Sequence, residues 1–293
     1  MRNFKKFLTR SIATVLLALT VGCFAPTETT TRPSPPSTPA QGPTSSAASR
    51  SPKLKIRQSP SPIKSVHLAL GNPSNADTDP NNYLMVKAQY VLSYDRDKGI
   101  PNWVSWQLNQ SWLGNVDRGN DFRPDTTLPT GWYQVRPGDY TGSGYDRGHL
   151  CPSGDRTRSA IDNSATFSMT NMIPQAPENN REVWRELEEY SRELVNQGKE
   201  LYIIAGGVGK KATLKGKVTV PEKTWKVIAV LEQGQGESGV SANTRLIAVM
   251  MPNSDQVART NWTDYLVSVD KVEVAAHYTS RSNSNDSSSS IHC

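Results

Sequence analysis

The sequence predicts a mixed α+β domain in which strands lie before and after one long helix. Two β-rich segments, residues 84–94 and 102–108, have the composition of a hairpin, with Gly99 and Pro101 in the turn between them. Residues 181–197 place apolar side chains on one helical face. Short apolar runs after the helix are typical of further strands, and they occur at residues 200–206, 225–231 and 246–251.

The long helix has signals at both ends. Asn179, with Glu182 three residues later, has the pattern of a capping box, and Gly198 is a typical stop. By contrast, residues 110–148 are polar and rich in glycine, which indicates a functional loop rather than a core element.

The start of the chain has the pattern of an export signal. The first ten residues carry four positive charges, and residues 12–21 are apolar but too few to cross a bilayer, which takes about 20. We therefore expect a signal peptide over residues 1–23 and an exported protein, located in the periplasm, the cell envelope or outside the cell. The segment ending at Cys23 resembles a bacterial lipobox, with Thr20 where Leu is usual. Cys23 is thus a candidate lipid anchor to the membrane.

Two further segments have few large apolar side chains. Residues 24–64 are dense in Pro, Ser and Thr, and we expect them to form a disordered linker. Residues 280–293 are expected to form a disordered tail. The folded domain is therefore predicted at residues 65–279.

Net charge alone gives a misleading picture of the partner. The formal net charge of +6 suggests a polyanion, but residues 1–62 hold nine basic residues and one acidic residue, which leaves 24 basic and 26 acidic residues in the remainder. Any attraction to phosphate must therefore come from a local cluster. All nine basic residues between Lys98 and Lys199 are arginines, whose planar fork matches phosphate oxygens. The alternative is surface arginines that pair with neighbouring acids.

Cysteine and histidine are scarce. The three cysteines, Cys23, Cys151 and Cys293, are too few for a disulfide framework. The four histidines form no HxxxH pair, so a zinc site built from nitrogen and sulfur ligands is not expected.

The densest group of reactive side chains is the sequence YDRGHLCP at residues 145–152. Hydrolysis of a phosphodiester needs a base for the attacking water and positive groups on the phosphate. His149 titrates near neutral pH, as a general base should, and Arg147 is a candidate phosphate ligand next to Asp146. The alternative is a surface turn that holds a histidine without a chemical role.

A second polar group leads into the helix. Residues 170–181 contain four amide side chains and two prolines. A single amide oxygen leaves most of the coordination shell of Mg²⁺ as water, which suits this ion. If Asn180 opens the helix, Glu188 lies roughly 12 Å along its axis, so Glu188 would act through metal-bound water. The alternative is that Glu188 and Arg192 form an ordinary i,i+4 ion pair on an exposed helix face.

The two groups together resemble the DNA/RNA non-specific endonuclease family. DRGH is followed about 30 residues later by the pattern N-x-x-x-W-x-x-x-E-x-x-x-R, and the likeness extends over residues 84–278 with the segments TNMIPQ, LYIIAGG and VSVDKVEVAAHY. The resemblance implies a ββα-metal nuclease fold, with a central antiparallel β-sheet flanked by helices. It also implies one Mg²⁺ ion, with Mn²⁺ as a substitute, and cleavage of DNA and RNA that leaves 5′-phosphate and 3′-hydroxyl ends. A dedicated protein inhibitor is a further partner that the resemblance allows.

Each site residue takes its role from this resemblance. His149 would be the general base and Asn180 the sole direct metal ligand, while Glu188 would hold metal-bound water. Asn180 is preferred over Asn179 because its spacing to Glu188 matches the family pattern. Residues that would bind or neutralise phosphate are Arg147, Arg192 and Arg118. Supporting polar residues are Asp146 and Asn171.

Several alternatives stay open. Cys151 departs from the family pattern and lies two residues after His149, so in an extended segment both would face the same way. A Cys–His nucleophile pair therefore stands against a small buried cysteine. For the whole protein, the alternatives are a non-catalytic surface protein that binds or takes up nucleic acid on the same scaffold, and an enzyme for small phosphodiesters.

Overall fold

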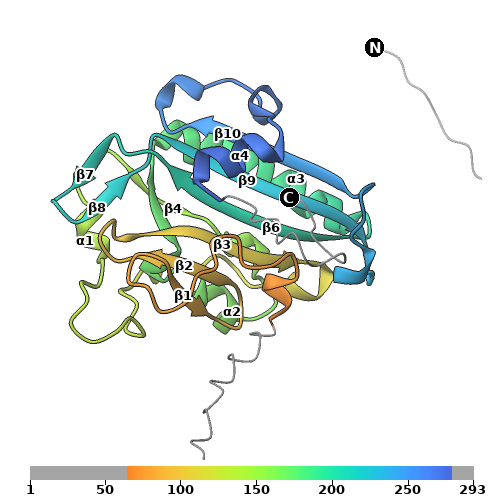
Figure 1. Cartoon of the computed structure of the whole chain (residues 1–293), viewed down its shortest axis with the longest axis horizontal. Coiled ribbons are helices and arrows are strands. Elements are labelled where there is room, and N and C mark those ends of the chain that lie inside the picture. The colour runs from red at the N-terminus through yellow and green to blue at the C-terminus, as the bar shows by residue number, and fades with distance from the viewer. Residues whose placement is uncertain (1–64, 279–293) are drawn as a thin grey trace, which may run out of the picture. The chain divides into compact units, whose positions relative to one another are not determined.

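The computed structural model describes residues 65–278, whose centre is a six-stranded antiparallel sheet in the order β1-β2-β3-β6-β9-β10 (Figure 1). Its strands are β1 (Tyr83–Val86), β2 (Val91–Asp95), β3 (Ile100–Leu108), β6 (Lys199–Val208), β9 (Lys223–Glu232) and β10 (Arg245–Pro252). The predicted signal peptide with its lipobox at Cys23, the linker and the C-terminal tail lie outside the described residues. No helix within residues 65–278 is long and apolar enough to cross a membrane.

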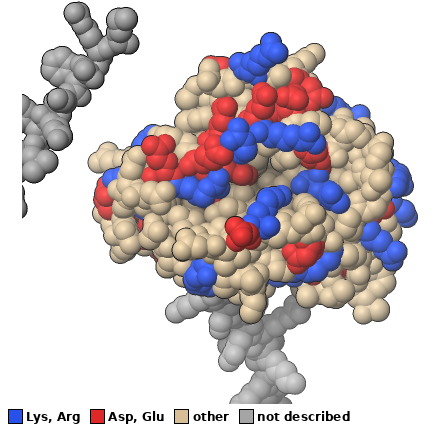
Figure 2. Space-filling view, turned by 180° about the vertical axis from the view of Figure 1, so that it is seen from behind, with Lys and Arg blue, Asp and Glu red and all other residues tan. Residues whose placement is uncertain are grey.

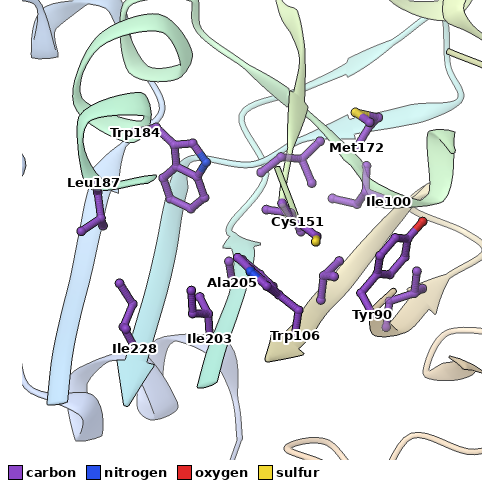
Figure 3. Close-up of a cluster of buried hydrophobic side chains, with 14 of the residues drawn as sticks. Tyr90, Ile100, Trp106, Cys151, Met172, Trp184, Leu187, Ile203, Ala205 and Ile228 are labelled. Carbon is purple, nitrogen blue, oxygen red and sulfur yellow. The ribbon is translucent and has the colours of Figure 1, made fainter. Parts of the chain in front are cut away.

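Helices cover both faces of the sheet, with α4 in front of it and α3 behind it in Figure 1. On one face, Trp184 and Leu187 of α3 (Trp184–Asn196) pack with Ile203 and Ile228 (Figure 3). On the other face, Val272 of α4 (Val269–Ala276) packs with a second cluster, formed by alternate strand residues such as Trp225 and Val227. Because both faces are buried, the central strands are almost continuously apolar.

One predicted strand is in fact two strands. Residues 84–94, expected as a single strand, contain β1, a tight turn and β2, with Met85 opposite Leu92. The backbone N–H of Lys87 donates to the carbonyl of Tyr90 at 3.0 Å and closes the turn. This turn contains no Gly, Pro, Asn or Asp, so the run of β-forming residues hides it. The predicted turn at Gly99 joins β2 to β3, and its φ of +65° favours glycine.

The long helix begins later than predicted. Regular α3 starts at Trp184, and Asn179–Val183 forms a π-helical turn, η5. The predicted capping box is wrong, because Glu182 accepts a hydrogen bond from the backbone of Arg259 at 2.9 Å instead. Gly198 follows the helix with φ +83°, as expected for a stop.

The predicted functional loop at residues 110–148 is only partly a loop. It contains the short helices η2 (Gln110–Trp112) and α1 (Pro137–Tyr140) and ends in strand β4 (Asp146–His149). Its buried side chains join the main core, among them Trp112, Leu128, Val135 and Tyr140. The other elements are η1 (Val66–Leu68), η3 (Ser153–Asp155), α2 (Ala160–Ala165), η4 (Met169–Asn171), β5 (Met172–Gln175), β7 (Ala212–Leu214), β8 (Val218–Val220), η6 (Glu237–Gly239), η7 (Asp255–Val257) and η8 (Trp262–Tyr265).

A fully buried arginine ties this segment to the sheet. The guanidinium of Arg156 donates to the carbonyl oxygens of Gln89 at 2.5 Å and Gln107 at 3.0 Å, and it lies 4.2 Å from the ring centre of Trp112. The hydrogen bonds to the carbonyls of Gln89 and Asp155 are buried, so the arginine satisfies acceptors that would otherwise be unpaired.

We expect Arg156→Met to lower the free energy of unfolding by about 3 kcal/mol, because it leaves buried carbonyls without donors. Urea denaturation followed by circular dichroism measures the change. Arg158→Met is the matched control, since Arg158 covers the same Trp112 ring but is 49% exposed and ion-paired with Asp162. The control should lose less than about 1 kcal/mol. Equal losses in the two variants would contradict a structural role specific to Arg156.

Candidate active site

A two-stranded ribbon brings the two reactive sequence groups together. β4 pairs antiparallel with β5, with Asp146 opposite Gln175 and His149 opposite Met172. The chain then passes from β5 through η5 into α3. The histidine and the amide-rich helix entry are therefore parts of one strand–strand–helix unit.

Gly148 makes this pairing sterically feasible. It lies opposite Ile173, and a Cβ atom at this position would overlap the side chain of Gln175. Gln175 is fully buried, and its amide nitrogen donates to Asn179 Oδ1 at 2.7 Å. Because Gln175 is held in place, no side chain larger than hydrogen fits at position 148.

His149 lies between two phenylalanines. Its ring centre is 4.9 Å from that of Phe167 and 5.5 Å from that of Phe122, and the residue is only 6% exposed. Within residues 65–278, its Nε2 atom has no hydrogen-bond partner. Burial, together with the positive charges of Arg118 and Arg147, lowers the pKa of His149 to about 3. The expectation that His149 titrates near neutral pH is therefore wrong: the imidazole is neutral, which is the form that accepts a proton.

Arg118 and Arg147 are held against the same aromatic pair. The guanidinium of Arg147 lies 4.3 Å from the ring centre of Phe122, and that of Arg118 lies 5.2 Å from that of Phe167. Arg118 also donates to the Ser153 hydroxyl at 2.7 Å. Cation–π contacts of this kind orient a guanidinium without neutralising its charge.

Other arginines of the lysine-free segment have acidic partners. Ion pairs join Arg123 to Asp121, Arg158 to Asp162, Arg181 to Asp146 and Arg185 to Glu189. Neither Arg118 nor Arg147 forms such a pair within the described part of the chain. Arg118 and Arg147 therefore fit the interpretation as phosphate ligands, and the ion-paired arginines fit the alternative of surface arginines that pair with neighbouring acids.

Glu188 and Arg192 line one cavity of about 230 Å³ together with Arg118, Ser153, Gly154 and Arg185. Lys and Arg side chains surround a hollow on this side of the molecule, with acidic side chains beside them (Figure 2). The cavity therefore joins Arg118 and η3 to α3.

Glu188 and Arg192 do not form the i,i+4 ion pair that was the alternative interpretation. Arg192 pairs instead with the buried Asp155 at 2.9 Å. Glu188 lies 3.9 Å from the ammonium of Lys226, and its side chain is 14% exposed. Burial raises the pKa of Glu188 to about 7, against the opposing effect of Lys226 and Arg192.

Asn180 is held by Asp146, while Asn179 serves the core. The amide nitrogen of Asn180 donates to Asp146 Oδ2 at 2.9 Å, and Arg181 binds both carboxylate oxygens of Asp146, at 2.6 and 2.8 Å. Burial opposes ionisation of Asp146, but the hydrogen bonds from Arg181 and Asn180 lower its pKa on balance. Asn179 is fully buried, and its amide nitrogen donates to the carbonyl of Pro252 at 2.9 Å. This leaves the Asn180 oxygen, without a hydrogen bond in residues 65–278, as the candidate ligand atom.

Asn171 supports the segment that follows His149. Its side chain accepts from the backbone N–H of Cys151 at 3.0 Å and donates to the carbonyl of Cys151 at 2.8 Å. Cys151 itself is fully buried in the main core (Figure 3), and burial raises the pKa of its thiol to about 12. A Cys–His nucleophile pair is therefore excluded in favour of a small core cysteine.

Several contributors to the site were not predicted from the sequence. Phe122, Phe167, Ser153 and Asp155 belong to no motif, and they come from separate loops and a short helix. Lys226 had a signal, because it interrupts the apolar run TWKVIAVL of β9. A charged residue at a core-facing strand position needs a buried partner.

Comparisons with known proteins identify relatives of this chain. A family model for the DNA/RNA non-specific endonucleases matches residues 71–287. A protein named Nuclease from Nostoc sp. is 58% identical over 228 residues, which cover 76% of this chain and 83% of that protein. Nuclease EXOG, mitochondrial, from Xenopus laevis is 32% identical over 180 residues, covering 56% of this chain and 49% of that protein. A crystal structure of the EndoG/EndoGI complex aligns with a TM-score of 0.62 and 27% identity, over 75% of this chain and 92% of that one.

Gly148→Ala should lower the free energy of unfolding by about 1–3 kcal/mol, because the added methyl group must displace a buried glutamine or separate the ribbon. Thermal unfolding of the metal-free protein measures this loss. Gly138→Ala is the control, since a Cβ at Gly138 meets nothing within 4 Å. A Gly148→Ala variant as stable as this control would mean that the tight approach to Gln175 does not constrain the ribbon.

Proposed function

The chain belongs to the DNA/RNA non-specific endonuclease family, and from its site we propose an exported, sugar-non-specific endonuclease that uses one Mg²⁺ ion and leaves 5′-phosphate ends. Membership makes it an endonuclease that hydrolyses phosphodiester bonds on the ββα-metal fold. The observation that carries the finer proposal is the neutral, buried His149 beside two arginines that have no acidic partner among residues 65–278.

In the proposed reaction His149 takes a proton from the attacking water. Its neutrality follows from burial and from the charges of Arg118 and Arg147. The same two guanidiniums face a phosphate group and neutralise its oxygens as charge builds up in the transition state. The Phe122 and Phe167 rings hold the guanidiniums in place before the substrate arrives, so little reorganisation is needed.

The polar side chains at the helix entry fit a divalent cation. Asn180 presents a hard, neutral amide oxygen, with its amide nitrogen oriented by Asp146. Glu188 presents a carboxylate in the cavity that also contains Arg118, where it would hold metal-bound water. A bound Mg²⁺, or Mn²⁺ in its place, would stabilise negative charge on the phosphate and the leaving oxygen.

Features outside the site support the remaining parts of the proposal. The basic and apolar start of the chain supports export, with Cys23 as a candidate lipid anchor. Arginines directed at the phosphate backbone carry no sequence information, which supports cleavage of DNA and RNA without sequence preference. A protein inhibitor is proposed as a partner because the similar structure is that of EndoG in complex with EndoGI.

We expect His149→Ala to lower kcat on supercoiled plasmid and on RNA by about 10²–10⁴-fold, because it removes the general base. Binding of DNA in EDTA, followed by fluorescence anisotropy, should change by less than about threefold. The matched control is His277→Asn, at an exposed residue with φ +59°, a conformation that asparagine tolerates. Full activity of His149→Ala would remove this residue from the mechanism.

EDTA is expected to abolish cleavage of both substrates, and added Mg²⁺ or Mn²⁺ should restore it. Asn180→Ala should raise the Mg²⁺ concentration needed for half-maximal activity by at least about tenfold, because it removes the only direct protein ligand. Undiminished cleavage in EDTA would exclude the metal from the reaction. Nucleic-acid binding without any Mg²⁺-dependent cleavage would instead favour a non-catalytic binding or uptake protein.

A further inference from the structure

A lysine lies inside the core beneath the candidate site. The side chain of Lys226 is 1% exposed, although it belongs to a central strand of the sheet. Its strand neighbours Trp225 and Val227 belong to the cluster on the α4 side, whereas Ile228 belongs to the cluster on the α3 side. Alternation along the strand places Lys226 on the α3 side, toward the site.

Helix α3 contacts the Lys226 ammonium from two sides. The Nζ atom is 4.0 Å from the ring centre of Trp184 and 3.9 Å from Glu188 Oε1. Trp184 and Glu188 are four residues apart on the helix, so their side chains lie on the same face. The ring of Trp106 lies 5.9 Å from the same ammonium, on β3.

The buried carboxylate of Asp155 forms an ion pair with Arg192, the other cation near Glu188 on α3. Asp155 of η3 accepts a hydrogen bond from Arg192 at 2.9 Å and another from the Trp106 indole at 2.9 Å. The charge of Arg192 is therefore directed at Asp155. Arg118, at the rim of the cavity, donates to Ser153. Lys226 is the cation that forms an ion pair with Glu188.

We propose that Lys226 is a positioning residue of the active site, whose ammonium fixes the Glu188 carboxylate at the edge of the cavity. The inference rests on the proposed function, in which Glu188 holds metal-bound water. The Glu188 carboxylate contacts the buried Lys226 ammonium and also lines the cavity, where its side chain is 14% exposed.

The groups around Glu188 determine how its protonation responds to loss of the lysine. Lys226 from β9, Arg192 on α3 and Arg118 at the rim favour the ionised carboxylate, while burial and Asp155 of η3 disfavour it. Lys226 is the largest of the favourable influences. Removal of its charge must raise the pKa of Glu188, so a higher pH is needed to keep the carboxylate ionised.

The test compares Lys226→Met with Lys223→Met, a control at an exposed lysine of the same strand. Lys226→Met should lower kcat about 10–100-fold and shift the acid limb of the kcat/KM profile upward by about one pH unit or more. Lys223→Met should leave both unchanged. An unshifted acid limb in Lys226→Met would overturn the proposal.

A double-mutant cycle with Glu188→Gln separates positioning from packing. With no carboxylate to hold, Lys226→Met should cost less than about threefold in kcat in the Glu188→Gln background. At a pH above the raised pKa of Glu188, the double variant should also be more stable in EDTA than Lys226→Met alone, because it no longer buries an unpaired carboxylate. Equal losses in both backgrounds, and no recovery of stability, would assign Lys226 to core packing.

Unfolding in EDTA needs no catalysis, and if Lys226→Met alone fails to fold, recovery of a folded protein in the double variant would still support the ion pair. If the wild-type protein shows no Mg²⁺-dependent cleavage, the proposed function fails. Coupling between positions 188 and 226 in unfolding would still support the ion pair, and its absence would overturn the inference independently.

Discussion

The pairing of β4 with β5 is the constraint on which the rest of the site depends. It places His149 opposite Met172, and the chain that leaves β5 enters the turn that carries Asn180. A slip of one residue would turn His149 to the other face of the ribbon. In the observed register Gln175 packs directly against Gly148, where a Cβ atom would overlap it.

Charge near the site is arranged at two depths. In the core, Arg192 pairs with Asp155 and Lys226 pairs with Glu188. At the surface, the guanidiniums of Arg118 and Arg147 lie on aromatic rings with no acidic partner in the described chain. The positive field is therefore local, which explains how a domain with slightly more acids than bases still suits a polyanion.

Sequence patterns predicted the features that depend on short spacing. The DRGH group, the apolar face of α3 and the stop at Gly198 all follow from residues close together in the sequence. The aromatic pair of Phe122 and Phe167 could not be predicted in this way, because 45 residues separate them and only the tertiary fold brings them to His149. The π-helical turn was also missed, since Asn179 bonds to distant core atoms rather than to its own helix.

Composition could not divide the arginines by role, because the same side chain serves three purposes here. Arg156 satisfies buried carbonyls, Arg158 pairs with Asp162, and Arg147 lies over an aromatic ring. What separates these roles is the partner, and the partner is set by the fold. In the proposed reaction the substrate phosphate supplies the counter-charge for Arg147. A phosphate is common to every nucleotide, so recognition through such a group cannot distinguish one base, or one sugar, from another.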